Sequence, residues 1–170
     1  MTPPQSRHFL VTPSGISADM LLARLHAGLD AASLLVSEGP DQAAIAACLT
    51  KPAQAKGIAV LIEYDTELAK SCGADGVMTG GSLKSWQAAK AALPQGAIVG
   101  GRCTSRHQAM DLAEAGADFV AFSDPALIAW WAEIFQVPCV DAVPGRSLPE
   151  ADFITPGESV WSLADAKNAP

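Results

Sequence analysis

The sequence predicts an α/β fold: a small TIM-type (β/α)8 barrel with helices missing or shortened after the seventh and eighth strands. Three observations predict it. Short apolar runs alternate with helical patterns along the chain, and one local pattern recurs four times. The composition, 49% hydrophobic and 17% charged, fits buried parallel strands covered by Ala-rich helices.

The recurring pattern is a helix end, a short turn and then an apolar run, and in each copy the turn contains Asp. The four copies span residues 27–36, 72–78, 115–121 and 149–154. Gly28, Gly73 and Gly116 suit the position just after a helix, where a left-handed backbone costs glycine nothing. Each copy therefore predicts the start of a buried strand, and three of the four mark a preceding helix end with glycine.

Four other apolar runs lie between these copies. They are short, rich in Val, Ile or Leu, and bounded by Gly, Pro or charged residues, as buried parallel strands are. These runs span residues 9–12, 58–64, 97–101 and 137–143, which brings the predicted strands to eight.

Helical patterns fill most of the intervals. They span residues 17–27, 41–50, 67–71, 82–93, 104–115 and 124–135. The last begins with Asp124-Pro125, an N-cap followed by a first-turn proline.

Strict strand–helix alternation gives either a closed barrel or an open, doubly wound sheet. Eight strands with a paired repeat favour the barrel, although 170 residues fall short of the usual floor of about 200. We predict one domain over residues 1–170. The connection at 145–151 is too short for a packed helix, so apolar sheet is left uncovered on that side. A homodimer that covers it is one hypothesis.

Charge and cysteine usage exclude several function classes. The net charge of −7 and pI near 4.8 argue against nucleic acid as a partner. The sequence has no apolar run of about 18 residues and no apolar N-terminal leader, so we expect no membrane span and a cytoplasmic location. Cys48, Cys72, Cys103 and Cys139 stand singly, which predicts free, mostly buried thiols.

Three motifs between residues 65 and 120 occur in a specific order. They are Asp65-x-Glu67-Leu68-Ala69, then Gly73-Ala74-Asp75-Gly76-Val77 with Gly80, and Ile98-Val99-Gly100 through Ala113-x-x-Gly116-Ala117-Asp118-Phe119-Val120. In this order and spacing the chain resembles the thiamine phosphate synthase/TenI-like barrel family, from Phe9 to about Ser159. The resemblance implies a role in thiamine biosynthesis. That family joins a pyrimidine pyrophosphate to a thiazole phosphate, with Mg²⁺ neutralising the leaving pyrophosphate.

The resemblance also shows where the reacting groups of that family should stand. Leu35, Ser37 and Gly39 replace its Gln-x-Arg-x-Lys after the second strand. Glu63-Tyr64 replaces Asn-Asp, and Leu83 replaces the second metal-binding Asp. We therefore expect that the Mg²⁺ ligands are not retained, with no metal site and no cofactor. We therefore also expect a degenerate active site that lacks ordinary Mg²⁺-dependent synthase activity.

Other candidate residues stand at the carboxyl ends of the strands, where barrels build their sites. Glu63, Tyr64 and Asp141 are catalytic candidates. Arg102 is the ligand-binding candidate; as the only cation expected at this rim, it would face Glu63 and Asp141. After the eighth strand, Thr155, Gly157 and Ser159 could hold phosphate. Pro156 and Glu158 oppose that role and favour a simple turn.

Three functional hypotheses remain open at this stage. The first is a degenerate barrel that binds a small phosphorylated or carboxylated metabolite near Arg102. The second is a barrel enzyme with a rebuilt site that uses Glu63, Tyr64, Arg102 and Asp141. The third is a non-catalytic protein-interaction module. For it we predict that one of the adjacent Trp130 and Trp131 packs on the barrel while the other stays partly exposed.

Overall fold

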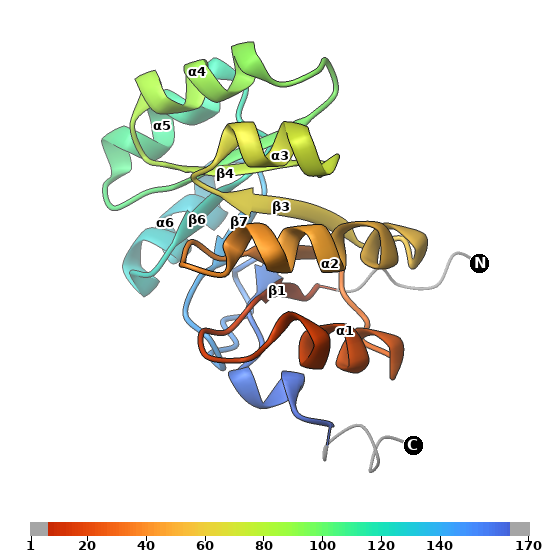
Figure 1. Ribbon diagram of the computed structural model, residues 1–170. Coiled ribbons are helices and arrows are strands. Elements are labelled where there is room, and N and C mark those ends of the chain that lie inside the picture. Colours follow the sequence, from red (N-terminus) through yellow and green to blue (C-terminus); the bar gives the residue numbers. More distant parts are fainter. Residues whose placement is uncertain (1–6, 164–170) are drawn as a thin grey trace, which may run out of the picture.

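The computed structural model describes residues 7–163 and shows a parallel β-barrel with helices packed around most of its outer face (Figure 1). Eight parallel strands follow one another around the barrel in chain order. They are β1 (Phe9–Val11), β2 (Ser33–Val36), β3 (Ala59–Glu63), β4 (Gly76–Gly80), β5 (Ile98–Arg102), β6 (Val120–Phe122), β7 (Cys139–Asp141) and β8 (Phe153–Ile154). A parallel bridge between His8 and Ile154 brings β8 back beside β1. The predicted barrel is confirmed; residues 1–6 and 164–170 of the predicted domain lie outside the described residues.

Six α-helices of the described chain match the six predicted ones. They are α1 (Ala18–His26), α2 (Gln42–Ala55), α3 (Thr66–Cys72), α4 (Leu83–Ala92), α5 (Arg106–Ala115) and α6 (Pro125–Ile134). The Asp124 side chain accepts a hydrogen bond from the Ala126 N–H at 2.9 Å, so the predicted N-cap is confirmed. Helix α2 is longer than predicted because it continues through Pro52 and buries Ala53.

The aspartates of the repeated pattern tie neighbouring strands together. Asp75, Asp118 and Asp152 each precede an even-numbered strand, and each accepts a backbone N–H from the strand before it. The donors are Val60, Val99 and Cys139, at 2.7, 2.8 and 2.9 Å. The repeat is therefore a structural device at the amino-terminal end of the barrel.

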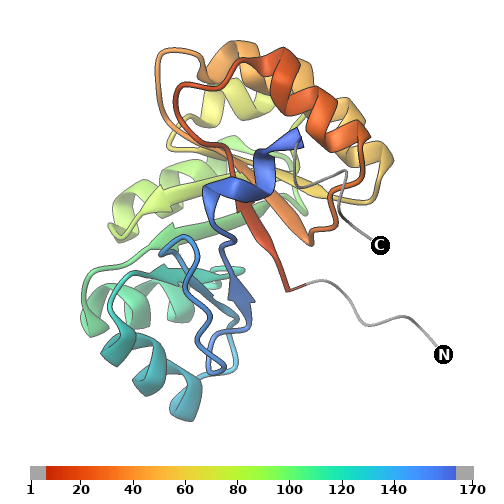
Figure 2. The ribbon, with the colours of Figure 1, turned by 90° about the horizontal axis from the view of Figure 1, so that it is seen from below.

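The β7–β8 side of the barrel lacks packed helices, as predicted. Within residues 7–163, a loop follows β7, and a short 3₁₀ helix, η1 (Glu158–Trp161), follows β8. The buried Trp161 donates its Nε1–H to the Val11 carbonyl at 3.0 Å, and Arg24 of α1 donates to the Val160 carbonyl at 2.7 Å. Figure 2 shows η1 crossing beside α1. The chain thus supplies part of its own cover on this side, and the predicted homodimer stays a prediction.

The two adjacent tryptophans of α6 have different environments, as predicted. Trp131 is buried, stacks on Phe135 with ring centroids 4.0 Å apart, and donates to the Val137 carbonyl at 2.7 Å. Trp130 is half-buried beneath the Arg106 guanidinium. Any test of a protein interface on this helix therefore belongs at Trp130, because replacing Trp131 would damage the core.

Candidate functional site

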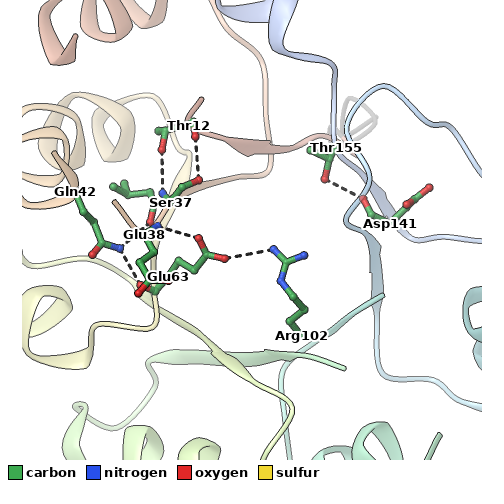
Figure 3. A network of polar contacts seen from close by, with 9 residues as sticks. Thr12, Ser37, Glu38, Gln42, Glu63, Arg102, Asp141 and Thr155 are labelled. Atoms are coloured by element: carbon green, nitrogen blue, oxygen red, sulfur yellow. Dashed lines mark hydrogen bonds and ion pairs between the residues drawn. The ribbon is translucent and has the colours of Figure 1, made fainter. Parts of the chain in front are cut away.

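Strand alternation decides which polar residues point into the barrel. Leu61 of β3 and Ile98 of β5 pack in the interior cluster. Side chains two residues apart share a face, so Glu63 and Arg102, at the carboxyl ends of these strands, also point inward. Figure 3 shows the two side chains pointing toward each other across the end of the barrel. The predicted juxtaposition of Glu63 and Arg102 is confirmed.

Glu63 is held from two sides. Its Oε1 lies 3.4 Å from Arg102 Nη2, and its Oε2 accepts the Glu38 N–H at 2.9 Å. The buried Gln42 donates to the Glu63 carbonyl at 2.8 Å and to the Val36 carbonyl at 3.2 Å. The loop after β2 therefore fixes Glu63 in place (Figure 3).

Arg102 is less tightly engaged than its partner. Its side chain is 31% exposed, against 12% for Glu63, and the 3.4 Å contact is long for a charge-assisted hydrogen bond. A guanidinium has five N–H donors in a planar fork. Arg102 can therefore offer further donors to a carboxylate or phosphate at the rim.

Asp141 does not join this pair, which corrects the prediction that Arg102 faces it. Val140 packs inside the barrel, so Asp141, the next residue on β7, points outward. Its fully buried carboxylate accepts two hydrogen bonds from Arg146, at 2.6 Å from Nη2 and 2.9 Å from Nε. The Val143 N–H adds a third at 3.1 Å.

Arg146 is a residue that sequence reasoning missed, and its presence corrects the view of Arg102 as the only cation near the rim. Besides Asp141, it donates to the Ser123 carbonyl at 2.9 Å. The hydrogen bonds from Arg146 to Asp141 raise the pKa of the guanidinium above its ordinary value. The sequence feature that could have identified Arg146 is its position as a cation in the short loop that follows Asp141.

Tyr64 has an unusual backbone conformation. Its φ of 64° makes it the one non-glycine residue of the described chain with positive φ. Its N–H donates to the Met78 carbonyl at 3.0 Å, and the next residue, Asp65, caps α3 by accepting the Leu68 N–H at 2.9 Å. Tyr64 as a whole is 45% exposed. A left-handed backbone strains a bulky residue, and such strain gathers at functional sites.

The segment after β8 is engaged in holding the barrel end together. Thr155 is buried and donates its hydroxyl to the Asp141 carbonyl at 2.9 Å, while its own carbonyl accepts the Gly145 N–H at 2.9 Å. Gly157 precedes η1, and Ser159 is exposed within it. A phosphate site at Thr155, Gly157 and Ser159 stays a prediction, and the Thr155 hydroxyl already has a structural partner.

A small pocket of about 110 Å³ lies between the loops that follow β1 and β2. Thr12 and Ser37 both line it, and Ser37 donates its N–H to the Thr12 hydroxyl and its hydroxyl to the Thr12 carbonyl, each at 2.9 Å. Glu38 also lines it, and the Glu38 N–H is bonded to Glu63. The pocket therefore adjoins the Glu63–Arg102 pair.

The carboxylates after β3 show how the site compares with a magnesium centre. Glu63 is bound by Arg102 and the Glu38 N–H, and one oxygen of Asp65 caps α3. Across residues 7–163, the structure brings together no group of three or more His, Cys, Asp or Glu side chains that could hold a metal ion. Mg²⁺ is often held by one or two carboxylates together with substrate phosphates, so the expectation that the family's Mg²⁺ ligands are not retained stays a prediction.

Comparison with known proteins identifies the family. The model of the thiamine monophosphate synthase family matches residues 9–141, from the start of β1 to the end of β7. The chain belongs to this family. The thiamine-phosphate synthase of Rhodospirillum centenum is 31% identical over 92% of this chain and 89% of its own length. That of Hyphomonas neptunium is 33% identical over 98% of this chain and 90% of its own.

Solved structures agree on the fold. A thiamine phosphate pyrophosphorylase from Pyrococcus furiosus superimposes with a TM-score of 0.75 at 17% identity, covering 96% of this chain and 91% of that one. A 2-keto-3-deoxy-6-phospho-gluconate aldolase from Zymomonas mobilis gives 0.69 at 16% identity, over 96% and 93%. In the described part of this family member, no helix is long and apolar enough to cross a membrane.

Proposed function

We propose that this member of the thiamine monophosphate synthase family is a cytoplasmic protein that binds a small phosphorylated or carboxylated metabolite at Arg102. In this proposal the site is degenerate, and the protein lacks ordinary Mg²⁺-dependent synthase turnover. The observation that carries it is the inward-pointing, partly exposed Arg102 at the carboxyl end of β5.

The geometry of the Glu63–Arg102 pair supports binding of an anion. A long 3.4 Å contact leaves most of the guanidinium fork without a close partner. Glu63 offsets part of the positive charge, and an incoming carboxylate or phosphate would compete with it. Because the Glu38 N–H holds Glu63 on its other side, the carboxylate stays in place when the ligand binds.

The replaced residues support the absence of synthase turnover. Leu35 is a buried core residue, and Leu83 is the first residue of α4. Neither side chain can ligate a metal ion or hold pyrophosphate. The relatives, in contrast, are named as thiamine-phosphate synthases. A turnover measurement therefore distinguishes this proposal from the alternative that the chain has the activity for which its relatives are named.

A rebuilt enzyme is the second candidate, and the strained Tyr64 beside Glu63 is the observation that favours it. In that case Glu63 would act as base and the Tyr64 phenol would contact the substrate. Asp141 would take no part, because it points away from the barrel interior and is bound to Arg146.

Calorimetric titration with inorganic phosphate and with thiamine phosphate tests the binding proposal. We expect Arg102→Gln to weaken binding at least about tenfold, and Glu63→Gln to tighten it, since the competing carboxylate is removed. Arg106→Gln is the matched control, because Arg106 is exposed and lies over Trp130. Unchanged affinity in Arg102→Gln would contradict the proposal, as would an equal loss in the control.

A further inference from the structure

Among residues 7–163, the barrel has an unfilled space at its amino-terminal mouth, the end opposite Arg102. A cavity of about 270 Å³ opens there. Five lining residues are the first residues of their strands: Phe9, Ser33, Ala59, Ile98 and Phe153. Barrel interiors are ordinarily filled by layers of side chains. Here the small side chains that open β2 and β3 leave the outermost layer incomplete.

Three phenylalanines form part of the wall of this cavity. Phe9, Phe119 and Phe153 all contribute to the lining, and the rings of Phe9 and Phe119 lie 5.7 Å apart at an angle of 59°. The Phe119 ring packs directly against the backbone at Gly100, where any side chain would collide with it. Rigid aromatic walls favour a flat aromatic guest through edge and offset ring contacts.

Two polar side chains, Ser33 and Asp118, set the charge preference of the mouth. One oxygen of Asp118 accepts the Val99 N–H at 2.8 Å, which leaves the second as an acceptor. Within residues 7–163, the cavity lining contains no Lys, Arg or His, and the nearby Arg7 is bonded to the Ala151 and Asp152 carbonyls. The mouth therefore favours a guest with an N–H donor and disfavours an anion.

We propose that this amino-terminal mouth binds a neutral bicyclic aromatic molecule that carries an N–H donor. An apolar cavity of about 150 Å³ accommodates benzene, so one of 270 Å³ has room for two fused rings. The rings would lie against Phe9, Phe119 and Phe153, and the N–H would point to Asp118 or Ser33. Indole is the simplest probe with these properties.

The proposal is independent of the anion site. The two sites lie at opposite ends of the strands and select opposite chemistry: an anion at Arg102, and a neutral aromatic ring at Phe9. The result for indole binding therefore does not depend on whether phosphate binds at Arg102.

The test is titration of the full chain with indole, followed by calorimetry and by backbone NMR. We expect a dissociation constant of about 1 mM or tighter, with the largest shift changes at Phe9, Phe119 and Phe153. Ala59→Leu should fill the cavity and weaken indole binding at least about tenfold. Ser33→Leu is a second filling variant, in case Ala59→Leu does not fold.

The matched control is Ala91→Leu, the same change on the exposed face of α4, which should bind indole as the parent does. Benzoate, an aromatic anion, should bind at least about tenfold more weakly than indole. Undiminished indole binding in both filling variants would overturn the proposal. It would equally fail if shift changes centred on Glu63 and Arg102, if benzoate bound as well as indole, or if no binding appeared at about 10 mM.

Discussion

Two arginine–carboxylate pairs stand near the carboxyl end of the barrel, and they differ in almost every respect. Arg146 and Asp141 meet through two hydrogen bonds of 2.6 and 2.9 Å, with a carboxylate that is fully buried. Arg102 and Glu63 meet through one contact of 3.4 Å, with both side chains partly exposed. The first pair lies outside the barrel wall, and the second lies inside it.

The contrast fits a structural role for Arg146 and the binding role that we propose for Arg102. Arg146 also reaches the Ser123 carbonyl, so it joins the β7–β8 loop to the end of β6, on the side that lacks helices. Arg102 makes no comparable set of bonds and keeps donors for a ligand. In the proposal, the closely bonded Arg146–Asp141 pair stabilises the fold, and the looser Arg102–Glu63 pair binds the ligand.

The largest expected effect is on stability, from Arg146→Met. Removing this cation leaves the Asp141 carboxylate buried and without its charge partner, which costs about 3 kcal/mol. Arg102→Met, the same change in the other pair, should cost less than about 1 kcal/mol, because that pair is looser and more exposed. Urea unfolding of both variants measures the difference. Equal losses would contradict the distinction between the two pairs.

The second expected effect is on pH dependence, from a thiol next to the Arg102 pair. Burial raises the pKa of Cys103 to about 12 from the ordinary 9.0. Above pH 9 the unfolded chain therefore loses a proton that the folded chain keeps, and the free energy of unfolding falls as pH rises. The slope approaches about 1.4 kcal/mol per pH unit for this group.

Cys103→Ala should therefore make that alkaline slope shallower than in the parent chain. Both arginines stay charged through this range, so the ion pairs do not contribute to the change. An equally steep alkaline slope in Cys103→Ala would show that another group is responsible.

The smallest expected effect comes from Tyr64→Asn. Asparagine adopts a left-handed backbone more readily than tyrosine, so we expect a gain of about 0.5–1 kcal/mol in the free energy of unfolding. If the strain is kept for a ligand contact, the same variant should bind thiamine phosphate more weakly. Thermal unfolding and titration on one sample measure both. A stabilised variant with unchanged affinity would mean that the phenol has no part in the site.

The arrangement of strands and helices could be predicted from the sequence because it depends on hydrophobic periodicity and on the Gly, Pro and Asp residues at the ends of elements. The short runs bounded by Gly and Pro became strands, and Asp124-Pro125 began a helix as expected. Helix α2 passed its predicted end because burial of Ala53 outweighs the proline at position 52.

The site was harder to predict, and Asp141 shows why. Strands of a parallel barrel are apolar on both faces, so the sequence of β7 does not indicate which residues point inward. Side chains alternate between the two faces of a strand, so an error of one residue moves a side chain to the other face. Asp141 was predicted to point into the barrel, whereas it points outward. Arg146 lies in an irregular loop, where no periodicity places a side chain.

The most direct test of the central claim is a turnover assay on the purified chain. The claim is that the family scaffold is retained while the Mg²⁺–pyrophosphate chemistry is not. The chain is supplied with the pyrimidine pyrophosphate, the thiazole phosphate and Mg²⁺, and release of thiamine phosphate is followed over time. We predict no steady turnover, while Arg102-dependent binding of thiamine phosphate persists. Sustained, enzyme-dependent formation of thiamine phosphate would contradict the account.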